Sequence, residues 1–545
     1  MPAGGSFDLV ERPWVQVHRL DGGVEEVSLL DVFTRAGELR SVLGEVPTQS
    51  FAIMRLLLAI LHRAVGGPPD AAGWAELWEQ PGLPVADVSA YLDRFRARFD
   101  LLSAQTPFFQ VAGLHTVRGE HTGLDRLIAD VPAGARFFTT RLGSGVDRLS
   151  FAEAARWVVH CQAFDPSGIK SGAVGDPRVK GGRGYPIGTG WAGMLGGVLA
   201  EGRSLRETLL LNLIPDDFPG LQTSAVDLPV WERKPPGPRT EFPDGHPPAG
   251  PVQLYTWQSR RIRLFHDGEG VYGVLIANGD PMTPQNRFLT EPLSLWRRSL
   301  PQEKKSGVVP TYMPRTHDPE RAIWRGLEAL LQDTWHQAQG KNAAGFLRPA
   351  VLNWLEAARG QGLIEDGYQV RTRTIGMEYG SQSSTTAEII DDAVSVAVVL
   401  LGDAGQQLRA AAVDAVRDAE DAAQAVGNLA ANLAEAAGGE GAGPRDRARE
   451  SVYAELDRPY RQWLSRLGPG TSPSEVRARW QQEAYEIVRR LGRELVTQAA
   501  PVAWRGREVR GRHLSTPEAD IWFRRKLRQI FAYATNEKET AGVSA

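Results

Sequence analysis

The sequence predicts an α+β protein, with a mixed α/β N-terminal domain over residues 1–400 and a C-terminal four-helix bundle over residues 401–545. Two observations lead to this prediction. Before residue 400, strand-like segments alternate with helical segments and with loops rich in glycine or proline. After that point, fifteen alanines within residues 404–442 begin a series of long helical segments that are separated by short links.

The composition is that of a globular protein with a sizeable core. The chain has 545 residues, of which 42% are hydrophobic and 23% are charged, which excludes a disordered scaffold or a fibrous repeat. Its one cysteine, Cys161, excludes an internal disulfide and a multi-cysteine zinc site. The first residues do not resemble a signal peptide, and no apolar run approaches the roughly 20 residues that span a bilayer. We therefore expect a cytoplasmic protein without a membrane partner.

The N-terminal domain is expected to begin with a hairpin over residues 14–29, which turns at Asp21-Gly22-Gly23. Apolar spacing then predicts helices over residues 47–65, 85–100 and 149–164. Two loops should follow, one with eight glycines over residues 166–191 and one rich in proline over residues 231–251. A second hairpin, turning at Asp267-Gly268, and two helices over residues 322–339 and 346–359 are predicted next.

The last part of this domain contains two segments with strand propensity, residues 368–379 and 387–400. A small polar loop, GSQSSTT, joins them and places Gln382 near its tip. The helices of the bundle are expected over residues 404–442, 445–467, 474–497 and 516–534.

Charge is unevenly distributed although the net charge is only −3. Residues 388–440 contain ten acidic residues and two arginines, whereas residues 477–528 contain thirteen basic and six acidic residues. Such asymmetry indicates either a charged partner or mutual neutralisation across the bundle. Both interpretations remain open at this point.

Sequence motifs for catalysis are absent. There is no GxxxxGK[ST] or HExxH, and the ten histidines lack metal-ligand spacing, so we expect no enzyme, no metal and no cofactor. His266 and Asp267 form a possible metal dyad, but Asp-Gly is ordinary turn chemistry. Cys161 follows His160 on a predicted helix, where adjacent side chains diverge, and is expected to be a buried structural residue.

Several segments resemble the CasA-type large subunit of the type I-E CRISPR surveillance complex, Cascade. They are FDLVERPWVQV, PTQSFAIMRLLLAILHRA, GIKSG, RETLLLNLI, NGDPMTPQN with EPLSLWRRS, and the GSQS loop, in this order over nearly the whole chain. The resemblance implies a non-catalytic subunit that recognises the protospacer-adjacent motif (PAM) in double-stranded target DNA, helps to open the duplex for R-loop formation and supports recruitment of a helicase-nuclease. Its implied partners are guide RNA (crRNA), target DNA, the other Cascade subunits and that helicase-nuclease.

The resemblance also implies residue roles. Gln382, preceded by Ser381, corresponds to a wedge that separates the first target base pair; the alternative is an ordinary hairpin tip. Pro166, Ser167 and Gly168 correspond to a glycine loop that lies in the minor groove of the PAM, with Lys170 available to a phosphate; the alternative is a flexible surface loop.

Two further sets of residues are implied with less specific motifs. Phe138, Thr139 and Thr140 correspond to a loop that contacts the guide RNA, unless Phe137 or Phe138 anchors the loop in the core. The basic C-terminal stretch is expected to contact DNA phosphates or, alternatively, to be solvated or paired with the acidic first helix of the bundle. It includes Arg505, Arg507, Arg510, Arg524 and Arg525.

The chain departs from the family pattern in two respects. With one cysteine it lacks the zinc-binding insertion of some relatives, and no counterpart of the PAM-contacting lysine occurs between Arg261 and Gly279. Two other functions remain open from the sequence: a metal-dependent nuclease that uses His266 and Asp267, and a stand-alone duplex DNA-binding adaptor.

Overall fold

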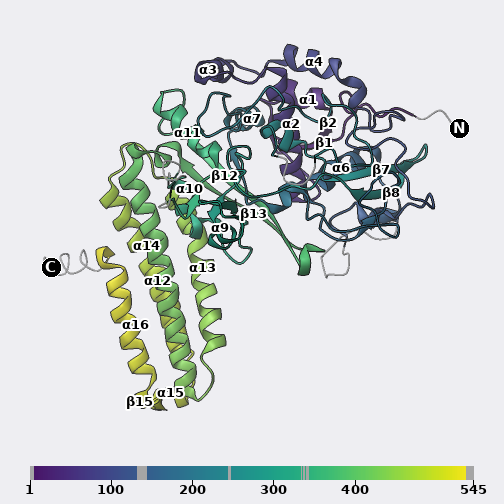
Figure 1. Ribbon diagram of the computed structural model, residues 1–545. Helices are drawn as coiled ribbons and strands as arrows, with labels where there is room; N and C mark the ends of the chain where they lie inside the picture. Colours follow the sequence, from purple (N-terminus) through teal and green to yellow (C-terminus); the bar gives the residue numbers. More distant parts are fainter. Residues whose placement is uncertain are drawn as a thin grey trace. The chain divides into compact units, whose positions relative to one another are not determined.

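The structure is a computed structural model that describes residues 5–131, 144–242, 247–332, 334, 338, 340 and 343–534. The chain forms two compact units (Figure 1). The larger unit contains Met1–Arg321, Gln332–Leu363 and Val370–Ala393, and the smaller unit contains Ala322–Leu331, Ile364–Gln369 and Val394–Ala545. The predicted α+β class is confirmed, with several small antiparallel sheets in the larger unit and long packed helices in the smaller one.

The larger unit is built around one buried helix. Helix α2 (Pro47–Ala64) is buried over most of its length and packs against α4 (Val85–Arg94), α6 (Phe151–Phe164) and α8 (Pro251–Tyr255). Within this core, Arg55 donates to Glu291 at 2.7 and 2.8 Å, and Trp191 Nε1 donates to the same carboxylate at 2.7 Å. The remaining α-helices of this unit are α1 (Leu29–Thr34), α3 (Ala71–Glu79), α4 (Val85–Arg94), α5 (Ser144–Asp147), α6 (Phe151–Phe164), α7 (Leu205–Leu211), α8 (Pro251–Tyr255), α9 (Leu300–Ser306) and α11 (Ala350–Gly360).

The strands of the larger unit form small antiparallel sheets around this core. Both predicted hairpins are present, as β1–β2 and β7–β8, and the segments on either side of the GSQSSTT loop are adjacent strands, β12 and β13. The sheets have the strand orders β2-β1-β3, β4-β5, β7-β8, β10-β9-β11 and β13-β12-β6. Their bounds are β1 (Val15–Arg19), β2 (Val24–Val27), β3 (Leu39–Val42), β4 (Lys170–Ser171), β5 (Arg183–Gly184), β6 (Gly197–Glu201), β7 (Arg260–His266), β8 (Val271–Asn278), β9 (Trp296–Arg298), β10 (Tyr312–Pro314), β11 (Phe346–Leu347), β12 (Gln369–Tyr379) and β13 (Thr386–Ala397).

The helix predicted over residues 322–339 is wrong. The structure has a 3₁₀ turn, Ile323–Gly326, and the short helix α10 (Glu328–Leu331) instead. Trp324 is the physical reason, because its ring stacks on Tyr460 at 4.6 Å and its Nε1 donates to Asp457 Oδ1 at 2.8 Å. This tertiary anchoring overrides the local helical pattern.

The smaller unit consists mainly of four long helices that lie side by side (Figure 1). The alanines of α12 (Gln406–Ala437) are largely buried. This helix contacts each of α13 (Ala442–Leu464), α14 (Pro473–Thr497) and α16 (Thr516–Ile530). Small side chains allow close approach of neighbouring helices, so the alanine-rich sequence explains the central position of α12. The bounds in this unit are α12 (Gln406–Ala437), α13 (Ala442–Leu464), α14 (Pro473–Thr497), α15 (Pro501–Arg505), β14 (Arg507–Val509), β15 (Arg512–Leu514) and α16 (Thr516–Ile530).

Close approach between α14 and α16 makes Gly492 a critical position. A Cβ atom added to Gly492 would lie only 2.2 Å from the ring of Phe523. We therefore expect Gly492→Ala to lower the free energy of unfolding by about 1–3 kcal/mol through overpacking, despite the higher helix propensity of alanine. Gly443→Ala, at an exposed position in α13, is the control and should raise stability by up to about 1 kcal/mol. Equal effects of the two variants in urea denaturation would contradict this expectation.

Candidate nucleic-acid interface

The loop between β12 and β13 is a short, internally bonded projection, which we call the wedge loop (residues 380–385). The Gly380 N–H donates to the Thr385 carbonyl and the Ser383 N–H donates to the Gly380 carbonyl, both at 2.9 Å. Gln382 and Ser383 have φ values of +56° and +54°, a left-handed conformation that is uncommon for residues other than glycine. Gln382 is exposed at this tight turn, so its amide is presented by a backbone with little freedom.

The segment that follows α6, residues 165–168, is hydrogen-bonded to the wedge loop. The Ser167 N–H donates to the Ser383 carbonyl at 2.8 Å. Directly before the wedge loop, at the end of β12, the Tyr379 hydroxyl donates to the Phe164 carbonyl at 2.7 Å. The structure thus brings together Ser167 and the wedge loop, which are more than 200 residues apart in the sequence. Each was predicted from the sequence as a separate DNA-contacting element.

Arg260 holds residues 165–168 in place through hydrogen bonds from its side chain. Its side chain is fully buried, and Nη2 donates to the carbonyls of Asp165, Pro166 and Gly188 at 3.1, 3.0 and 2.8 Å. Its Nε donates to the carboxylate of Asp165. One guanidinium therefore fixes the backbone at both ends of the segment with eight glycines (residues 166–191), which we call the Gly-rich segment. Leaving a polar group unpaired at this buried site would lower the stability of the fold.

Lys170 is the second partner of Asp165. Its Nζ lies 2.5 Å from Asp165 Oδ2, and its side chain is only 16% exposed. Burial by itself raises the pKa of Asp165, but Lys170 and Arg260 together hold this pKa below its ordinary value. In this structure the ammonium group of Lys170 is thus engaged by an internal carboxylate, whereas the sequence prediction assigned it to a phosphate.

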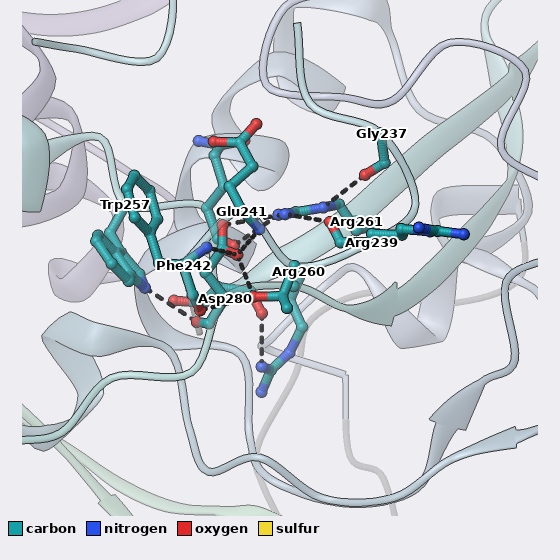
Figure 2. A network of polar contacts seen from close by, with 12 residues as sticks. Gly237, Arg239, Glu241, Phe242, Trp257, Arg260, Arg261 and Asp280 are labelled. Atoms are coloured by element: carbon teal, nitrogen blue, oxygen red, sulfur yellow. Dashed lines mark hydrogen bonds and ion pairs between the residues drawn. The ribbon is translucent and has the colours of Figure 1, made fainter. Parts of the chain in front are cut away.

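The neighbouring arginine on β7, Arg261, holds a different loop (Figure 2). Consecutive strand residues point to opposite faces, and Arg261 donates to Asp280 Oδ2 at 3.0 Å and to the Gly237 and Arg239 carbonyls at 2.8 and 2.9 Å. The other oxygen of Asp280 accepts hydrogen bonds from the backbone N–H groups of Glu241 and Phe242. This network fixes part of the Pro-rich loop against the β7–β8 hairpin.

Two cavities flank the wedge loop. One, of about 270 Å³, is lined by residues including His160, Lys170 and Thr386, and the other, of about 620 Å³, is lined by residues including His317, Gln382 and Ser383. Ser167 lines both cavities. The wedge loop and Ser167 therefore form a divider with open space on each side.

His160, at the base of the first cavity, is uncharged. Burial lowers its pKa to about 3, and its Nε2 lies 2.9 Å from the Thr48 hydroxyl. Within the described residues its Nδ1 has no hydrogen-bond partner. The adjacent thiol of Cys161 is buried and its pKa is raised by burial, which fits the expected structural role.

The possible metal dyad has a different arrangement from that of a metal site. Asp267 makes a two-pronged ion pair with Arg148, at 2.5 and 2.9 Å, and this hydrogen bonding lowers the Asp267 pKa to about 2. His266 stands edge-on to Phe151. Among the described residues, no group of three or more His, Cys, Asp or Glu side chains is arranged to hold a metal ion.

Comparisons with known proteins match one family over most of the chain. A sequence model of the family "CRISPR-associated protein Cse1" matches residues 8–491. The chain is 49% identical to Cse1 from Thermobifida fusca, whose crystal structure superposes with a TM-score of 0.90 over 97% of this chain and 99% of that one. The chain belongs to the Cse1 (CasA) family.

Two more distant relatives extend this finding. The CasA/Cse1 protein of Thermus thermophilus is 29% identical over 464 residues, which are 82% of this chain and 81% of that protein. A chain in a structure described as a CRISPR RNA-guided surveillance complex is 20% identical, with a TM-score of 0.62 over 90% of this chain and 99% of that one, and thereby shares the fold.

The remaining residues assigned from the Cse1 resemblance belong to two other parts of the sequence. Phe138, Thr139 and Thr140 fall outside the described residues, so their assignment to guide RNA stays a prediction. Arg505, Arg507, Arg510, Arg524 and Arg525 are all exposed in the smaller unit. Arg524 pairs with Asp520, and Arg510 lies 3.6 Å from Glu435 of α12. Acidic residues of α12 therefore neutralise part of the positive charge of the C-terminal stretch. The pair of Arg477 with Asp418 is a further example.

In this Cse1 chain no helix of the described residues is long and apolar enough to cross a membrane. Asp165, Arg260 and Ser383 are site residues that no pattern in the sequence had predicted. The available signal was weak: two adjacent arginines, Arg260 and Arg261, at the start of a strand that otherwise combines apolar residues with Arg263 and His266.

The ion pair between Lys170 and Asp165 can be tested by stability. We expect Lys170→Met to lower the free energy of unfolding by about 1.5–3 kcal/mol, because it removes a charged hydrogen bond to a buried carboxylate. The stabilisation depends on the lowered pKa of Asp165, so in the wild type it is present above about pH 4 and lost as the pH falls through the folded-state value. Lys234→Met, which changes an exposed lysine, is the control. Equal stability of the two variants would contradict the assignment.

His160 should make the protein acid-sensitive. The unfolded chain takes up a proton at His160 below about pH 6.5, whereas the folded chain does not until about pH 3. Stability should therefore fall by about 1.4 kcal/mol per pH unit from this group as the pH decreases through that window. In urea denaturation between pH 7 and pH 4, we expect His160→Gln to lose stability less steeply than the wild type. Parallel curves would show that His160 is not the group responsible.

Proposed function

We propose that this Cse1 protein is a non-catalytic subunit of an RNA-guided CRISPR surveillance complex, Cascade, that recognises the PAM in double-stranded DNA and helps to open the duplex. The observation that best supports the proposal is the hydrogen bond between Ser167 and Ser383, which joins the loop implied in PAM contact to the loop implied in strand separation. Support for membership of the complex comes from the shared family and fold. We further propose that the chain supports recruitment of the helicase-nuclease.

In this proposal the wedge loop enters the duplex beside the PAM. Gln382 replaces stacking and hydrogen bonding that the first base pair loses, since its amide both donates and accepts. Separating a base step requires a few kcal/mol, so a loop that moved on insertion would lose part of the available binding energy. The internal hydrogen bonds of the wedge loop and its bond to Ser167 supply the required rigidity.

The segment 165–168 is suited to lie along a groove. Gly168 has a φ of +142° and no atom within 4 Å of an added Cβ, so it leaves the backbone open to close approach. Residues 165–168 are neutral apart from Asp165, which is buried and paired. Backbone contact in the minor groove distinguishes base pairs only coarsely, which fits tolerant PAM recognition.

The proposed function is tested by DNA binding of the guide-RNA complex, assembled with and without this chain, on targets with and without a PAM. PAM-dependent binding that appears only when the chain is present supports the proposal. Unchanged binding would overturn it. Tight PAM-selective binding by the isolated chain would instead indicate a stand-alone adaptor.

Gln382 should act on duplex opening and not on assembly. We expect Gln382→Ala to slow R-loop formation by at least tenfold, because the amide is lost, while assembly of the complex is unaffected. The free energy of unfolding of the Gln382→Ala chain should differ from that of the wild type by less than about 0.5 kcal/mol, since the side chain is exposed. The control is Gln361→Ala, at an exposed glutamine outside the wedge loop, which should open DNA at the wild-type rate. A normal opening rate for Gln382→Ala in stopped-flow fluorescence would rule out the wedge role.

A further inference from the structure

The Gly-rich segment contains a sharply defined hairpin whose tip has no assigned role. Strands β4 and β5 pair Lys170 with Gly184 and Ser171 with Arg183. Directly before β5 the chain makes a second, tight turn: Lys180 and Arg183 exchange both backbone hydrogen bonds, at 3.0 and 3.1 Å, around the two residues Gly181-Gly182. The φ values of these glycines are +58° and +73°, the left-handed pair that a type I′ turn requires.

This turn places two cationic side chains directly opposite each other. Lys180 and Arg183 are cross-strand partners, and both are exposed. Like charges in this position repel and destabilise a hairpin. Within the described residues neither side chain has an ion pair, and the nearest acidic residues of the segment are engaged elsewhere: Asp176 by Arg178, and Asp165 by Lys170 and Arg260. The tip is therefore a concentrated positive charge without a counter-charge in the described part of the chain.

The backbone of the tip adds hydrogen-bond donors to this charge. The N–H groups of Gly181 and Gly182 have no hydrogen-bond partner among the described residues. Both glycines are exposed and have open space where a Cβ would lie. Unpaired N–H groups beside two cations place several donors together, which suits an anion with several acceptor oxygens.

The hairpin is held firmly against the rest of the larger unit. Arg178 donates to the carbonyls of Asn278 and Gly279 at 3.2 and 3.0 Å, and Asn278 Nδ2 donates to the Tyr185 carbonyl at 2.5 Å. A Cβ added to Gly172 would lie 2.5 Å from the backbone of Gly182, so the two arms are in close contact. The tip thus has a fixed position relative to Lys170, where β4 begins two residues after Gly168.

We propose that the Lys180–Arg183 tip binds a backbone phosphate of the target DNA duplex next to the wedge loop. This inference rests on the proposed function and adds to it a sequence-independent anchor. It also assigns the phosphate contact to cations that are free to make it, whereas Lys170 is engaged by Asp165. The contact positions the duplex and carries no base readout.

The test measures DNA affinity of the assembled guide-RNA complex as a function of salt concentration. Each phosphate contact contributes about 0.9 to the slope of log K against log salt. The double variant Lys180→Ser/Arg183→Ser should reduce this slope by about 1–2 and weaken binding to PAM and non-PAM duplexes by the same factor, about tenfold or more near physiological salt. The ratio of the two affinities, and assembly with guide RNA, should stay at the wild-type values.

Two control variants distinguish the loss of positive charge at this turn from other effects of the substitutions. The charge-retaining Lys180→Arg/Arg183→Lys variant should keep the wild-type slope. Arg12→Ser/Lys234→Ser removes two exposed cations elsewhere and should also keep it. A wild-type slope in the Lys180→Ser/Arg183→Ser variant overturns the proposal, as does loss of assembly with guide RNA in that variant, which would show that the tip binds RNA. Failure of the proposed function is distinct, because the wild-type complex itself would then lack PAM-dependent binding.

Discussion

The buried guanidinium of Arg260 is the interaction on which the candidate interface depends. It is fully inaccessible to solvent and joins Asp165 to the carbonyls of Pro166 and Gly188, so it fixes the start and the end of a segment that is too rich in glycine to be ordered by its own side chains. Burying a guanidinium and a carboxylate is unfavourable unless nearly every donor and acceptor is satisfied. Because all of these groups must be hydrogen-bonded, only a few positions of the 165–168 backbone are compatible with the network.

The alternation of side chains along β7 extends this effect to a second loop. Arg260 serves the Gly-rich segment on one face of the strand, and Arg261 serves the Pro-rich loop through Asp280 on the other (Figure 2). Both loops lack regular secondary structure over most of their length, so their carbonyl groups need donors from elsewhere. Two adjacent arginines supply these donors from one rigid hairpin. The same hairpin also receives Arg178, and the Gly-rich segment is therefore held from several directions.

Local patterns in the sequence predicted the elements better than the contacts between them. The β7–β8 hairpin, the 380–385 loop and the four long helices follow from turn residues and periodicity, which act over a few residues. Asp165 and Arg260 are 95 residues apart, and Ser167 and Ser383 more than 200, so no local pattern reports their pairing. The overlong helix predicted at Trp324 has the same origin, since Asp457 and Tyr460, more than 130 residues away, decide the local structure there.

The distribution of charge separates two tasks within the larger unit. At the wedge loop the exposed groups are neutral, Ser381, Gln382 and Ser384, and the two nearby cations, Lys170 and Arg260, are both paired with the carboxylate of Asp165. A neutral polar loop can lie among bases without attraction to the backbone phosphates, which a free cation at this position would prefer. Within the described residues, cations without an ion pair lie instead at the Gly181-Gly182 turn beside β5, where backbone hydrogen bonds fix the turn. Strand separation and electrostatic attachment therefore need not compete for the same side chains.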